Sequence, residues 1–98
     1  MPDVEILSER EFEGGWSFEL RFGGGDGAGV TRTLRLSWAD YDLWSNDGSD
    51  PPHAVARAVA VFLLSRITAS DLPAILDAST ARRRFHDADD EIPKLIGT

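Results

Sequence analysis

Cysteine is absent from this chain of 98 residues. Its absence excludes disulfide bonds, thiolate catalysis and zinc sites with cysteine ligands. Long apolar runs are also absent, because the longest, residues 58–64, is far shorter than the roughly 20 residues that a membrane-spanning helix needs. The first residues, Met-Pro-Asp-Val-Glu, lack the basic start of a signal peptide. We therefore expect a cytoplasmic protein that has no membrane partner.

Positive charge is scarce in the first half of the chain. The formal net charge is −7, to which residues 1–22 contribute −4 and residues 23–50 contribute −3, whereas the remaining residues are balanced. An acidic surface repels a phosphate backbone and attracts basic proteins. It also keeps a protein soluble without any partner. We expect no nucleic-acid partner, and a basic protein partner is one open alternative.

The hydrophobic period changes once, at Ser37. Apolar residues alternate at every second position before it, as in strands, and recur every three or four positions after it, as in helices. This order indicates a single α+β domain over residues 1–98, with antiparallel strands in 1–37 and a helical part in 38–98. We predict a three-stranded antiparallel β-meander followed by three to four α-helices packed on one face.

Turn length decides which strand residues share a face. A three-residue turn between the first two strands opposes Phe12 to Trp16 and places the apolar residues of both strands on one face. A two-residue turn would place them on opposite faces. The glycine-rich segment of residues 23–29 lacks a phosphate-binding motif and a following helix, so we interpret it as a hairpin loop. The predicted strands comprise residues 4–12, 16–22 and 30–37.

Capping residues and apolar spacing predict the helices. Ser37 three residues before Asp40 resembles a capping box, and Asp50 is a suitable N-cap for a helix that begins with Pro51. Apolar residues cover most of the circumference of that helix, so we expect it at the centre of the core. Arg83 lies four residues before Asp87, which predicts an ion pair on the last helix. The predicted helices comprise residues 38–44, 51–67, 71–78 and 81–88.

The sequence contains no complete catalytic or metal motif. The acids between Asp40 and Asp50 suit a hard cation, but their spacing does not match a calcium-binding helix-loop-helix motif. His53 and His86 have no second ligand at metal spacing and no nucleophile close by in sequence. We therefore expect no enzyme activity, cofactor or metal. A small enzyme, or a ligand- or metal-binding protein that uses the region from Asp40 to His53, is the alternative.

Surface residues of the strands and the first helix are the candidates for binding. Both outer strands of the predicted meander have open edges to which a partner, or a second copy in a homodimer, can add. Trp44 and Tyr41 would form an exposed aromatic anchor, unless they belong to the core. We predict a non-enzymatic protein–protein interaction module with an acidic strand face. The candidate partner-binding residues are Leu7, Glu9, Glu11, Glu19, Tyr41 and Trp44.

Several stretches along the chain form a pattern that is mainly hydrophobic. They are residues 33–37, Tyr41, Leu43, residues 62–66, residues 75–76 and Phe85. Together they resemble a group of short uncharacterised bacterial proteins. In that group an N-terminal hairpin precedes a helix that ends in a similar Phe-Leu-Leu segment. The resemblance implies the same order of strands and helices in a bacterial protein, and it implies no activity and no site residues.

Overall fold

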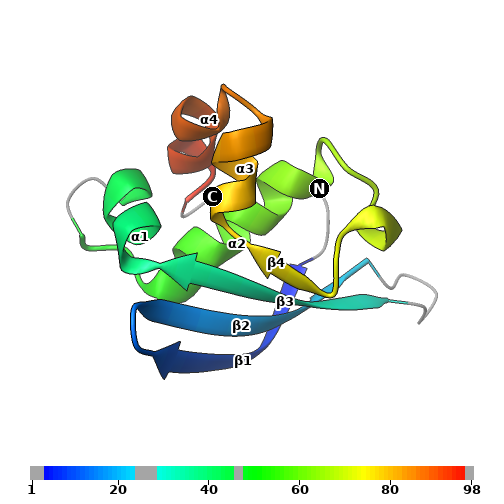
Figure 1. Ribbon diagram of the computed structural model, residues 1–98. Coiled ribbons are helices and arrows are strands. Elements are labelled where there is room, and N and C mark those ends of the chain that lie inside the picture. The colour runs from blue at the N-terminus through cyan, green and yellow to red at the C-terminus, as the bar shows by residue number, and fades with distance from the viewer. Residues whose placement is uncertain (1–3, 24–28, 46–47, 97–98) are drawn as a thin grey trace.

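The chain forms three antiparallel strands and then alternates helices with one short strand (Figure 1). The computed structural model describes residues 4–23, 29–45 and 48–96, so most of the predicted glycine-rich loop lies outside the described residues. The α+β class is confirmed. The elements are β1 (Val4–Phe12), β2 (Gly15–Phe22), β3 (Val30–Ser37), α1 (Trp38–Trp44), α2 (Pro52–Leu64), the 3-10 helix η1 (Ala69–Asp71), β4 (Ile75–Asp77), α3 (Ser79–Arg84) and α4 (Ala88–Leu95).

The sheet has one strand more than the predicted meander. Leu76 lies opposite Leu34 in a parallel pairing of β4 with β3, so the strands of the described residues form a four-stranded mixed sheet in the order β1-β2-β3-β4. The helix predicted over residues 71–78 is therefore wrong. Leu72 precedes a proline and is extended, with ψ at 142°, because the proline ring disfavours helical backbone before it. The predicted open edge of β3 is covered by β4.

The turn between β1 and β2 is shorter than the sequence predicts. Phe12 lies opposite Gly15 rather than Trp16, so two residues form the turn instead of three. Gly14 occupies the second turn position with φ at 104°, a backbone conformation that glycine adopts without a steric penalty. The predicted register of this hairpin is therefore wrong at the turn.

A β-bulge in β1 restores the pairing of apolar residues that a two-residue turn would otherwise prevent. Ile6 lies opposite Leu20 and Ser8 lies opposite Glu19, so β1 has one extra residue, Leu7, at this point. The part of β1 before the bulge contributes Val4 and Ile6 to the core. Beyond the bulge the alternation is inverted, and the odd-numbered and even-numbered residues of β1 exchange faces.

The inverted alternation changes the composition of the open sheet face. Arg10 and Phe12 share the face of Ser17, away from the helices. Glu9 and Glu11 instead pair with Phe18 and Trp16, the residues of β2 that face the core. Both glutamates stay exposed because β1 is the edge of the sheet. The predicted acidic outer face of the strands is therefore wrong beyond the bulge. That face carries both signs of charge.

Local capping signals produce the first two helices largely as predicted. The Ser37 side chain accepts a hydrogen bond of 3.1 Å from the Asp40 backbone N–H at the start of α1. α2 is shorter than predicted at both ends, and Pro51 rather than Asp50 is its N-cap. Asp50 instead accepts a hydrogen bond of 2.8 Å from the Ser45 hydroxyl. Its carboxylate therefore links the C-cap residue of α1 to the residue before the N-cap of α2.

The helices lie on one face of the sheet, with α2 closest to it (Figure 1). α3 and α4 replace the single predicted helix of residues 81–88, since Phe85 is extended and ends α3. The core between the layers is apolar, and burial of its side chains is the main source of stability. Its largest fully buried side chains include Phe18, Phe22, Leu34, Leu36, Trp44, Phe62, Leu63, Leu76 and Ile92.

Asp87 pairs with Arg66 and not, as predicted, with Arg83. Arg66 Nη1 donates to Asp87 Oδ1 at 3.1 Å, and a second bond joins Nη2 to Oδ2. The Arg66 guanidinium also lies 4.7 Å from the ring centroid of Phe62. A pair between Arg83 and Asp87 needs one continuous helix, but α3 ends at Arg84. Arg83 instead donates a hydrogen bond of 3.2 Å to the Thr80 hydroxyl.

This ion pair predicts a pH-dependent contribution to stability. The hydrogen bond from Arg66 lowers the pKa of Asp87 below its ordinary value of 3.8. The contribution is therefore complete above that value and is lost as the pH falls through the lowered pKa. Asp87→Asn should lower the urea midpoint slightly at about pH 7 and lower it less at about pH 2, where protonation competes with the ion pair. The control is Asp71→Asn, an exposed acid, and an equal effect of Asp87→Asn at both pH values would contradict the assignment.

Candidate binding face of the sheet

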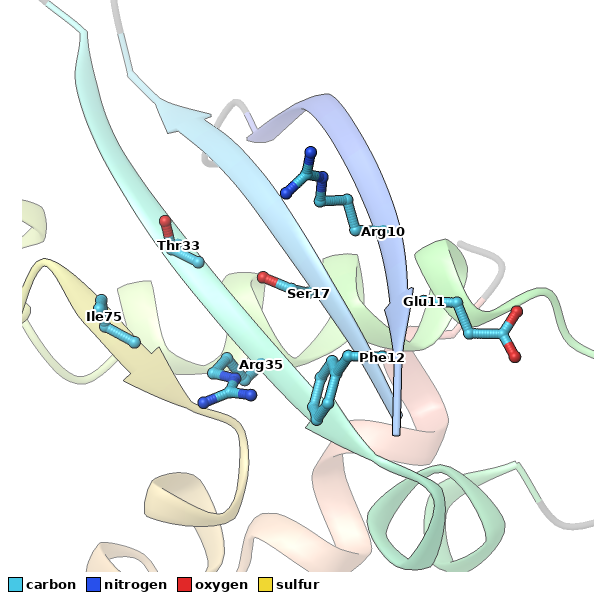
Figure 2. A pocket seen from close by; sticks show the side chains of 7 residues that line it. All are labelled: Arg10, Glu11, Phe12, Ser17, Thr33, Arg35 and Ile75. Carbon is cyan, nitrogen blue, oxygen red and sulfur yellow. The ribbon is translucent and has the colours of Figure 1, made fainter. Parts of the chain in front are cut away.

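The sheet face opposite the helices carries a shallow hollow (Figure 2). Its volume is about 320 Å³. The strand register builds its floor, because Ser17 lies between Arg10 on one side and Arg35 on the other. The hollow is lined by Arg10, Glu11, Phe12, Ser17, Thr33, Arg35 and Ile75.

The two arginines form opposite walls of this hollow. Because neighbouring strands lie about 4.8 Å apart, the backbones of Arg10 and Arg35 are separated by roughly twice that distance. The small side chain of Ser17 leaves the space between them open. Phe12 lies at the end of the hollow, and the Arg35 guanidinium is 4.3 Å from its ring centroid. The hollow therefore has one cationic side chain on each side of a small hydroxyl, and the Arg35 guanidinium lies beside an aromatic ring (Figure 2).

Neither arginine of the hollow has an acidic partner within the described residues. Arg35 lies opposite Asp77, but the Asp77 carboxylate accepts hydrogen bonds from the Ser79 backbone at 3.0 Å and the Ser79 hydroxyl at 2.9 Å. Other arginines of the described chain are engaged within the fold. The acceptors are Glu5 for Arg21, the Leu72 carbonyl for Arg32, Asp87 for Arg66, and both Asp40 and Asp89 for Arg82.

A second hollow extends the first along the same face. Its volume is about 440 Å³, and it shares Arg10, Ser17 and Thr33 with the first. Ser8 and Glu19 complete its lining, so one end of the combined groove carries a negative charge. The charge of the groove therefore changes along the strands, from the row of Arg10 and Arg35 toward Glu19.

Ile75 is the most exposed large apolar residue of those described, with 67% of its surface accessible. It lies on β4, opposite Thr33, at the margin of the first hollow. β4 is also the outermost strand on its side of the sheet. An isoleucine in this position costs solvation energy in the free protein, and a partner that covers it recovers that energy.

The predicted strand residues of the site lie in different places. Glu19 lies on the open face, and Leu7, which is 43% exposed, is the extra residue of the bulge. Glu9 is exposed on the edge strand and lies opposite Phe18. Figure 2 shows Glu11 pointing away from the other labelled side chains. These four residues therefore do not form one acidic surface.

The predicted aromatic anchor does not form as expected. Trp44 is 1% exposed, and its indole Nε1 donates to Asp89 Oδ1 at 3.0 Å, so it belongs to the core. Tyr41 is half-buried, and its hydroxyl donates to the Gly48 carbonyl at 3.1 Å and also to the Asp50 carbonyl. Trp38, by contrast, is 50% exposed. Trp44 is thus excluded as an exposed anchor.

The region from Asp40 to His53 is used mainly for contacts between helices. Asp40 is buried and lies 3.3 Å from Arg82 Nη1, which binds it to α3. Asp42 and His53 are exposed, and Asp47 lies outside the described residues. No group of three or more His, Asp or Glu side chains suited to a metal occurs in the described ranges. Among the described residues of this region, Asp40 is engaged with α3, and the enzyme or metal alternative stays a prediction.

The residues that form the hollow were not predicted from the sequence. The predicted three-residue turn places Phe12 on the core face and gives Arg10 no role, whereas the observed two-residue turn places both on the open face. The Glu-Gly pair at residues 13–14 is compatible with a two-residue hairpin turn and was the available signal. The bulge at Leu7 has no comparable signal, since neither glycine nor proline marks it.

The described helices include none that is both long enough and apolar enough to cross a membrane. Comparison of the chain with models of protein families, with curated proteins and with solved structures found no match.

Proposed function

We propose that this chain is a non-enzymatic protein–protein interaction module that binds through the open face of its sheet. One observation carries the proposal: this face presents a hollow with two unpaired arginines next to an exposed isoleucine. Elsewhere in the described fold, Arg66 and Arg82 form ion pairs with acidic side chains, and most large apolar side chains are buried. Unpaired cations beside exposed apolar surface are typical of binding surfaces, where a partner supplies the missing contacts.

A basic partner, the expectation from the acidic composition, fits this face less well than the rest of the molecule. Of the acids of β1 that suggested it, Glu9 lies opposite the core-facing Phe18, and Glu11 borders the hollow but points away from its other lining side chains. A homodimer through a strand edge is the other option, and the free edges are those of β1 and β4 among the described strands. A basic partner and a homodimer through the β1 edge require neither Ile75 nor the arginines, whereas a homodimer through the β4 edge would place Ile75 near the interface without requiring Arg10.

Capture of a partner by tagged variants tests the proposal. Ile75→Asp places a charge at the exposed margin of the hollow and should abolish stoichiometric capture from lysate of the source cells, with little effect on stability. Leu43→Asp is the matched control, because Leu43 is 41% exposed on α1, in the helical layer. It should leave capture unchanged. Equal capture by Ile75→Asp and the unaltered chain would contradict the proposed binding face.

A further inference from the structure

We propose that the hollow between Arg10 and Arg35 binds a carboxylate side chain on an extended segment of a partner protein. This inference rests on the proposed function and adds the chemical class of the segment. The chain has a net charge of −7, yet it leaves these two guanidinium groups without an acidic partner in the described residues. Charge complementarity therefore points to an anion as the occupant.

The chemistry of the hollow fits a carboxylate in particular. A guanidinium group donates two parallel hydrogen bonds to a carboxylate, and the side chains of Arg10 and Arg35 both line the hollow, one on each side of Ser17. The hydroxyls of Ser17 and Thr33 line the same space and can donate further bonds. The Phe12 ring beneath Arg35 restricts that guanidinium before binding, which reduces the entropy lost on binding.

A carboxylate suits this surface better than a phosphate group. Glu19 lines the adjoining hollow, and a doubly charged phosphate would be repelled by it and by the acidic chain as a whole. A single negative charge is balanced by the arginines at a smaller cost. An acidic protein segment is therefore favoured over a phosphorylated peptide or a nucleic acid.

The spacing of residue rows on the open face also favours one type of residue two positions away from the carboxylate in the partner segment. Arg35 and Thr33 are two residues apart on β3, and Ile75 lies opposite Thr33. Residues two apart in an extended segment are separated by about 6.6 Å, the same distance as the two rows on the face. A segment that runs along β3 with its carboxylate above Arg35, next to Ser17, would therefore place its residue two positions away above Thr33. Ile75 lies one strand spacing of about 4.8 Å from Thr33, so an aliphatic side chain at that position would contact the exposed isoleucine.

Nuclear magnetic resonance titration tests the inference with a defined probe. The probe is the blocked peptide acetyl-Thr-Glu-Thr-Leu-Thr-amide, and its control replaces the glutamate with glutamine. The glutamate peptide should give saturable shifts at Arg10, Ser17 and Arg35 with a Kd of about 1 mM or tighter. The glutamine peptide should bind about tenfold more weakly, because it loses the charge-assisted bonds. Absence of saturable shifts, or equal binding of the two peptides, would overturn the inference.

Charge variants identify the groups that carry the effect. Arg10→Gln with Arg35→Gln should weaken the glutamate peptide about tenfold or more. The control, Arg84→Gln with Lys94→Gln, removes the same charge from the helical layer and should leave the Kd unchanged. Equal loss in both double variants would show a nonspecific charge effect and overturn the inference. Stronger displacement by inorganic phosphate than by acetate would also overturn it, in favour of a phosphate ligand.

The two proposals can fail separately. If Ile75→Asp abolishes partner capture and the Arg10→Gln, Arg35→Gln double variant captures normally, the binding face stands and the carboxylate inference fails. If neither variant changes capture, both proposals fail. Loss of capture in both variants, together with binding of the glutamate peptide, supports both.

Discussion

Gly15→Ala is expected to remove most or all of the folding stability. The added Cβ would lie 2.1 Å from the Leu36 carbonyl oxygen and 2.9 Å from the Ser37 Cα, both backbone atoms of β3. Such an overlap cannot be relieved by rotating a side chain, so the strands must separate. Gly15 also pairs with Phe12 on β1, and displacement of β2 therefore disturbs both of its neighbours. We expect a loss of at least about 4 kcal/mol, near the limit for single substitutions.

Urea unfolding followed by circular dichroism measures this loss. Gly48→Ala is the matched control, because its added Cβ would meet no atom within 4 Å, although its φ of 67° still disfavours alanine. That strain should cost only about 1–3 kcal/mol. A midpoint for Gly15→Ala equal to or above that of Gly48→Ala would contradict the close approach of β2 to β3.

Trp44→Ala is expected to destabilise the fold by about 3–5 kcal/mol. Trp44 is 1% exposed at the end of α1, and its truncation leaves a large cavity between α1 and its neighbours. The substitution also removes the hydrogen bond to Asp89, which joins α1 to α4. Arg82 stays at 3.1 Å from Asp89, so this carboxylate keeps a partner and adds no further penalty.

The matched control for this prediction is Trp38→Ala. Trp38 is 50% exposed, so its truncation should cost no more than about 1 kcal/mol. The two variants lose the same atoms from the same helix, so the difference between them measures the burial of Trp44 together with its hydrogen bond to Asp89. Equal changes in the free energy of unfolding would contradict the opposite placement of the two indoles.

Elements with local signals were predictable from the sequence. α1 is recovered residue for residue, since Ser37 and Asp40 specify its start by a contact three residues apart. α2 is recovered within three residues, because an apolar surface on most of a helix requires burial from several sides. The pairing of β2 with β3 was predictable from parity, because seven residues between Phe22 and Val30 place Phe18 opposite Leu34, as the structure shows.

Elements that depend on distant contacts were not predictable. β4 has three residues, too few for a period of two to be visible, and its pairing with β3 joins residues about 40 positions apart. The bulge at Leu7 shifts a whole strand segment by one residue, so one local irregularity changed the assignment of every residue from Ser8 to Phe12. The candidate site was missed for this reason, because Arg10 and Phe12 reach the open face only through the bulge.

The tryptophans show the same limit. Trp38 follows Leu34 and Leu36 at alternate positions, and this spacing by itself favours a core position for Trp38. The helix begins at Trp38, however, and a change from period two to period 3.6 resets the direction of the following side chains. Trp44 is buried because α4 packs over it and Asp89 accepts its indole N–H, both consequences of tertiary structure.

Arginine footprinting of the chain in complex with its captured partner tests the binding face most directly. Phenylglyoxal modifies accessible guanidinium groups, and mass spectrometry of the digested protein assigns the modified residues. In the free chain, Arg10, Arg35 and Arg84 should all react, because all three are exposed. In the complex we predict protection of Arg10 and Arg35 with unchanged modification of Arg84. Protection of Arg84 with full reactivity of Arg10 and Arg35 would contradict binding through the open face of the sheet.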